Sequence, residues 1–97
     1  MKHTDLESYI NDRANQGLTK IEFVLEADPN VVNDFNVLKT KETYVYAAEG
    51  EADEAIDNFR TDPGFLGVEK KYKAGKMSKS GEEIKPETWS VIVKLAK

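Results

Sequence analysis

The spacing of apolar residues along the chain predicts a helix near its start. Apolar side chains recur there at helical intervals: Leu6, Tyr9, Ile10 and Ala14. This rhythm predicts a helix over 5–16. Thr4 and Glu7 have the spacing of a capping box, in which the two side chains satisfy free backbone N–H groups. Gly17 can adopt the left-handed conformation that ends a helix.

A second amphipathic helix is predicted over 51–60. Its apolar residues also fall on one stripe: Ala52, Ala55, Ile56 and Phe59. Most other positions are acidic, and the positive end of the helix dipole favours acids in the first turn.

Alternation of apolar and polar residues predicts four strands. They cover 20–27, 43–47, 65–73 and 88–95. Within the third strand, Leu66, Val68 and Tyr72 are expected on one side. A polar loop over 75–86 is expected to connect the last two strands.

The segment 29–40 fits two patterns. Asp28-Pro29 is typical of the start of a helix, and the apolar residues that follow would share a helical face: Val31, Val32, Phe35 and Leu38. Phe35 and Val37 would equally alternate on a strand. Helix and strand therefore both remain open for this segment.

These elements predict a single α+β domain over 1–97, with a mostly antiparallel sheet of about four strands and two or three helices on one face. A strand–helix–strand unit spans 43–73. The pattern of elements resembles a ferredoxin-like sandwich with an altered or permuted order.

Composition excludes several kinds of chemistry. The chain has no cysteine, and His3 is its only histidine, so thiolate sites and a Ser/His/Asp arrangement are excluded. No cofactor, metal ion or enzymatic activity is predicted. No apolar run approaches the roughly 18 residues of a membrane span. Charged and polar residues stand where a secretion signal would be apolar, so a cytoplasmic location is expected.

Lys76 to Ser80 reads KMSKS, which is identical to the signature loop of class I aminoacyl-tRNA synthetases. In that family the lysines of the loop stabilise the pyrophosphate side of ATP. The chain has neither the His-Ile-Gly-His motif that accompanies this loop nor the length of the nucleotide-binding domain. The match is therefore interpreted as a flexible Lys/Ser loop, and an anion contact by it remains open.

The charge distribution motivates the leading hypothesis, a small non-enzymatic binding or regulatory domain that acts through a protein partner. The net charge of −4 combines fourteen acids and six bases in residues 1–62 with four acids and eight bases in residues 63–97. Helix 51–60 would present acids to a basic partner: Glu51, Asp53, Glu54 and Asp57. The partner is not identified by the sequence, and a homodimer is also compatible with it.

A second hypothesis is weak nucleic-acid binding by a basic segment. Its residues are Lys70, Lys71, Lys73, Lys76 and Lys79. Lysines supply salt-dependent contacts to phosphates without reading bases. Aromatic residues on strands offer a stacking variant of this hypothesis, through Tyr44, Tyr46 and Trp89. Residues 64–68 faintly resemble the core of an RNA-recognition motif on a strand.

A third hypothesis is a small-molecule-binding or cofactor-independent ferredoxin-like protein. A pocket between sheet and helices would then be lined by aromatic residues: Tyr44, Tyr46, Tyr72 and Trp89. A pocket with converging polar groups would distinguish this hypothesis from the other two.

Overall fold

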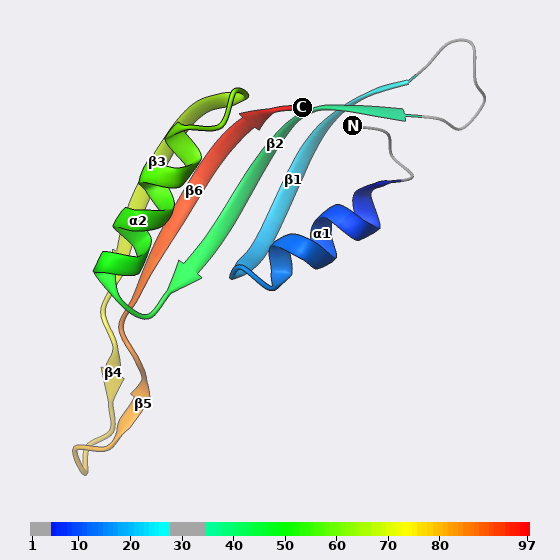
Figure 1. Ribbon diagram of the computed structural model, residues 1–97. Helices are drawn as coiled ribbons and strands as arrows, with labels where there is room; N and C mark the ends of the chain where they lie inside the picture. Colours follow the sequence, from blue (N-terminus) through cyan, green and yellow to red (C-terminus); the bar gives the residue numbers. More distant parts are fainter. Residues whose placement is uncertain (1–4, 28–34) are drawn as a thin grey trace.

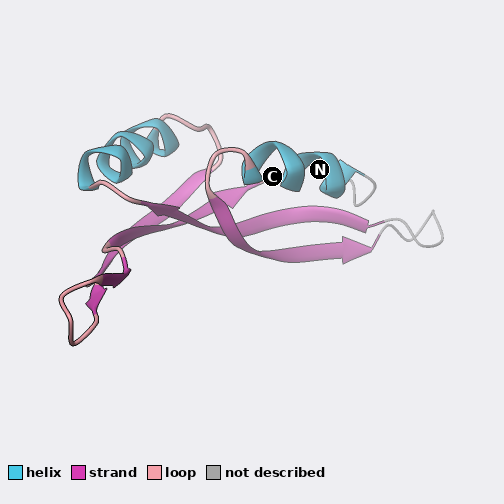
Figure 2. Cartoon of the chain, turned by 90° about the horizontal axis from the view of Figure 1, so that it is seen from below, coloured by secondary structure: helices cyan, strands magenta, loops and turns pink. Residues whose placement is uncertain are grey.

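Four long strands form one antiparallel sheet in the order β1-β2-β6-β3 (Figure 1). This computed structural model describes residues 5–27 and 35–97. The elements are α1 Leu6–Ala14, β1 Leu18–Ala27, β2 Phe35–Tyr46, α2 Glu49–Arg60, β3 Phe65–Lys73, β4 Lys76–Met77, β5 Glu83–Lys85 and β6 Thr88–Ala96. Both helices lie on the same face of the sheet (Figure 2). The predicted α+β class and antiparallel sheet are confirmed.

Both predicted helices are present, with ends that differ by a few residues. In α1 only Leu6 is fully buried, and Tyr9 and Ile10 are half-buried. Gly17 has a φ of +99°, which permits the sharp turn into β1. The Gly17 carbonyl accepts a hydrogen bond from the Val45 N–H at 3.2 Å, so the turn is attached to β2. Thr4, the predicted N-cap residue, lies outside the described residues.

The segment that fitted both helix and strand is a strand from Phe35 onward. The helical interpretation is therefore wrong for Phe35 and Leu38, and residues 28–34 lie outside the described part of the chain. The β1–β2 register shifts where Val24 and Leu25 pair with Lys39 and Val37, which leaves Leu38 as the extra residue of a bulge in β2. Val37 and Thr40 therefore both face the helices.

The core lies between α2 and the two central strands. Its buried residues come from all three elements: Tyr44, Ala52, Phe59, Val91, Val93 and Leu95. The rings of Tyr44 and Phe59 stand 4.9 Å apart, within the range of favourable aromatic pairs. The apolar stripe predicted for 51–60 is therefore the face of α2 that covers the sheet.

Two expectations for the C-terminal half are wrong. Leu66 is not on the same side as Val68, because a register shift between Phe65 and Gly67 turns Leu66 outward, and 53% of it is exposed. Phe65 packs against the core in its place. The expected loop over 75–86 contains a short hairpin, β4–β5, which projects beyond the end of the sheet (Figure 1).

Candidate functional site

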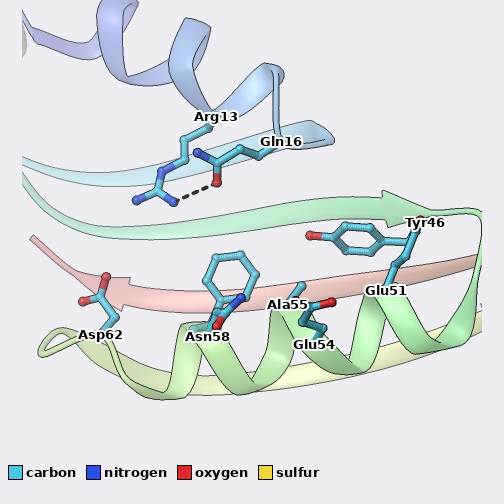
Figure 3. Close-up of a pocket in the computed structure, with 9 residues that line it drawn as sticks. Arg13, Gln16, Tyr46, Glu51, Glu54, Ala55, Asn58 and Asp62 are labelled. Atoms are coloured by element: carbon cyan, nitrogen blue, oxygen red, sulfur yellow. Dashed lines mark hydrogen bonds between the residues drawn. The ribbon is translucent and has the colours of Figure 1, made fainter.

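A groove of about 370 Å³ runs between α1 and α2 on the helical side of the sheet (Figure 3). Nine residues line it: Arg13, Gln16, Tyr46, Glu51, Glu54, Ala55, Asn58, Phe59 and Asp62. The volume is at the lower end of the range for ligand pockets, which suits one long side chain better than a large cofactor.

Helical spacing explains how α2 forms one wall of the groove. Glu51, Glu54 and Asn58 are three and four residues apart, so their side chains share one face of the helix. Arg13 and Gln16, at the end of α1, stand on the opposite side (Figure 3). Tyr46 enters the groove from the end of β2.

The groove is acidic with an aromatic component. Glu51 and Glu54 form no ion pair with any other described residue, and Arg13 is the one basic residue in the lining. The Tyr46 hydroxyl has no hydrogen-bond partner within the described chain. Burial raises the pKa of Tyr46, and the negative charge of Glu51 raises it further. The tyrosine is therefore a neutral donor beside unpaired carboxylates.

A buried carboxylate lies beneath α1. The side chain of Glu42 is fully buried, and it accepts hydrogen bonds from three hydroxyls. The donors are Tyr9 at 2.6 Å and Thr40 and Tyr44 at 2.5 Å each. Burial and the hydrogen bond to Glu42 raise the pKa values of Tyr9 and Tyr44. The cluster fixes α1 to β2 and so fixes one wall of the groove.

The Tyr9 ring connects this cluster to two cations. The Arg13 guanidinium lies 5.1 Å from the ring centroid, and the Lys97 ammonium lies 4.6 Å from it. Both distances are within the range of cation–π attraction. Arg13 therefore contacts the Glu42 cluster through Tyr9 and lines the groove at the same time.

The four acids that were predicted to contact a partner do not lie on one surface. Glu51 and Glu54 line the groove. Asp53 instead bonds the Lys70 ammonium at 2.8 Å, together with Glu49 at 3.1 Å. Asp57 is exposed and is not part of the groove lining.

The five lysines of the predicted basic segment do not form one surface. Lys70 faces α2, where it is held by the two acids just described. Lys71 and Lys73 alternate with it and therefore point to the opposite face of the sheet. Lys76 and Lys79 belong to the projecting hairpin.

The KMSKS segment forms β4 and the turn of that hairpin. The Ser78 hydroxyl accepts a hydrogen bond from the Glu82 N–H at 3.0 Å and lies 2.8 Å from the Ser80 hydroxyl. Gly81 completes the turn with a φ of +86°. The polar groups of Ser78 are therefore used within the turn.

The predicted aromatic residues lie on the helical side of the sheet, where Trp89 is the cross-strand neighbour of both Tyr46 and Tyr72. Tyr44 is fully buried, so it cannot stack on a base. Tyr72 and Trp89 pair with each other across β3 and β6, with ring centroids 5.3 Å apart. Tyr46 alone of the four lines the groove. The common aromatic pocket of the third hypothesis is therefore not formed there.

Sequence reasoning did not single out Glu42, Arg13 or Gln16. Glu42 precedes Tyr44 and Tyr46 at intervals of two, and this strand spacing placed it on the same face as those residues. No sequence signal joins Arg13 to α2, because their proximity depends on both helices covering one face of the sheet.

Among the residues whose side chains the structure describes, no group of three His, Asp or Glu residues could hold a metal ion. No helix in the described ranges is long and apolar enough to cross a membrane. No protein-family model, curated protein or solved structure matches the chain.

Proposed function

We propose that the protein is a small non-enzymatic binding domain that receives a basic side chain of a protein partner in the groove between α1 and α2. The observation that supports this proposal most directly is the acidic wall of Glu51 and Glu54 beside the Tyr46 ring: these carboxylates form no ion pair within the described residues, although Arg13 stands on the opposite wall. An arginine or lysine side chain would contact the carboxylates and lay its aliphatic part on the ring.

The size of the groove and its composition favour such a partner over a free metabolite. Its volume of about 370 Å³ accommodates a single extended side chain, and residues of α1 and α2 contribute to two of its walls. The carboxylates also increase the rate at which a basic partner arrives, because opposite charges attract over distances of about a Debye length.

We also propose that the fold is a circularly permuted ferredoxin-like fold. The element order along the main sheet is α1-β1-β2-α2-β3-β6. Placing β6 before α1 would give the β-α-β-β-α-β order of that fold, with β6 beside β2 at the centre of the sheet. An experimental structure with β6 at an edge of the sheet would refute this proposal.

The groove is tested with arginine-containing and glutamate-containing peptides of equal length, followed by NMR. The arginine peptide is expected to shift the amide signals of Ala55 and Asn58, and the glutamate peptide is expected to leave them unchanged. E54K is expected to weaken binding about tenfold, which corresponds to about 1.4 kcal/mol.

D57K is the matched control, because it makes the same charge change one turn further along α2, outside the groove lining. Equal losses in E54K and D57K would show that the net charge alone attracts the peptide. That result would refute a specific role for the groove.

A further inference from the structure

The face of the sheet opposite the helices is not covered by any described element (Figure 2). Strand alternation places six lysines on it: Lys20, Lys39, Lys41, Lys71, Lys73 and Lys94. In the described strands, three glutamates share this face: Glu22, Glu26 and Glu69. The open face is therefore basic although the whole chain carries a net charge of −4.

Two of these lysines stand directly opposite each other. Lys41 of β2 pairs with Lys94 of β6 at the centre of the sheet. Like charges in this arrangement are destabilising, because the two side chains extend side by side from the same face. A β-sheet normally places an opposite charge or a neutral residue at such a position. An external anion bound beside this pair would therefore reduce the repulsion between the two lysines.

The neighbouring carboxylates do not neutralise the pair. Glu22 lies across from Lys41 on β1, but its carboxylate bonds the Lys20 ammonium at 3.2 Å. Glu69 is 3.8 Å from Lys71. Within the described residues, no carboxylate oxygen lies within 4 Å of the ammonium groups of Lys39, Lys41 or Lys94.

These three lysines line one shallow trough. It has a volume of about 440 Å³ and is lined by Lys39, Lys41 and Lys94 together with Val24 and Leu66, among others. Val24 and Leu66 are 54% and 53% exposed. A second hollow of about 330 Å³ shares Lys41, Leu66 and Lys94 and extends towards Ile92. The bulge in β3 thus adds an apolar side chain to the basic trough.

We propose that this open face binds a single strand of nucleic acid through its phosphates. Lysines are accompanied on the face by hydroxyl residues, which are also common phosphate ligands: Thr43, Thr88 and Ser90. Among the described side chains on this face, none is an arginine for bidentate contacts to bases and none is an aromatic residue for stacking. Binding is therefore independent of sequence and equal for DNA and RNA.

The shape of the surface and its charge select this occupant. A single strand is flexible enough to follow the trough of about 440 Å³ and to place its phosphates beside Lys39, Lys41 and Lys94, which line it. A second copy of the chain does not fit face to face, because the lysines of the two copies would meet. The acidic groove lies on the other face of the sheet, so both sites can be occupied together.

The test is fluorescence anisotropy of labelled dT12 and rU12 at salt concentrations from about 25 to 200 mM. Dissociation constants on the order of 10⁻⁴–10⁻⁶ M are expected near physiological salt, with stronger binding at low salt. K41Q/K94Q is expected to bind about tenfold more weakly. The slope of log K against log salt is expected to decrease by about 1.4, since each phosphate contact contributes about 0.7 for single strands.

K76Q/K85Q is the matched control, because Lys76 and Lys85 are also an opposed lysine pair but lie on the projecting hairpin. It is expected to retain the affinity and the slope. The melting temperature of K41Q/K94Q is expected to equal or exceed that of the wild type, because the variant removes a repulsion.

Three results would overturn the proposal. The first is an equal loss of binding in the two double variants, and the second is a strong preference for one of the two oligonucleotides. The third is binding to vesicles that contain phosphatidylserine without binding to either oligonucleotide, which would assign the face to membranes instead.

Discussion

The buried carboxylate of Glu42 provides the sharpest test of what holds α1 to the sheet. In E42L the side chain keeps a similar volume but loses its acceptor oxygens. The hydroxyls of Thr40 and Tyr44, which are 2% and 0% exposed, then remain in the core without their partner. Each orphaned hydroxyl costs about 1–3 kcal/mol.

The gain from no longer burying a charge offsets part of this cost. We therefore expect E42L to lower the free energy of unfolding by about 2–4 kcal/mol. For a domain of this size that corresponds to a decrease in Tm of about 10–25 °C. Urea denaturation followed by circular dichroism and by Trp89 fluorescence measures both the midpoint and the slope.

A triple variant separates the lost hydrogen bonds from other effects. In E42L/T40V/Y44F the two fully buried hydroxyls are removed as well, and only the part-buried Tyr9 hydroxyl loses its partner, so most of the lost stability is expected to return. E22L is the control, because Glu22 is exposed on the open face and its replacement is expected to change stability by less than about 0.5 kcal/mol. A stable E42L, or a triple variant no more stable than E42L, would refute the role assigned to the carboxylate.

Two further predictions concern pH and glycine. Because the pKa values of Tyr9 and Tyr44 are raised in the folded state, their contribution to stability is complete below about pH 10 and is lost as the pH rises further. Between pH 8 and 11, the urea midpoint should therefore fall less steeply with pH in Y9F/Y44F than in the wild type. The same dependence of the midpoint on pH in both proteins would contradict this prediction. A Cβ at Gly64 would lie 2.2 Å from the Ala96 carbonyl oxygen, so G64A should lower the free energy of unfolding by more than about 2 kcal/mol. In α2, the added Cβ of G50A meets no atom within 4 Å, so the free energy of unfolding should increase by about 0.5–1 kcal/mol in the same denaturation assay. A destabilised G50A would show that free space around a glycine does not by itself determine the effect of its replacement.

The helices and most strands could be predicted from the sequence because their periodic patterns are strong. The first half of β2 could not, since Thr40 and Glu42 are polar residues that face the core. Bulges explain two of the failures: the one at Leu38 in β2 breaks the alternation, and the one in β3 exposes Leu66.

The candidate sites were only partly readable from the sequence. Glu51 and Glu54 were identified as acids of a helix, but Arg13 and Tyr46 join them only through the packing of separate elements. Lys70 and Lys71 are adjacent in the sequence, yet strand alternation sends them to opposite faces. Sequence proximity therefore grouped lysines that the sheet separates.

The central position of β6 also determines when the sheet can be completed. Since β2 and β3 are joined only through β6, both keep an unpaired edge until β6 has been synthesised and inserted. Pairings between segments so distant in the chain form slowly. During that interval the nascent protein exposes strand edges that can pair with other chains, which is the condition under which partly folded chains aggregate.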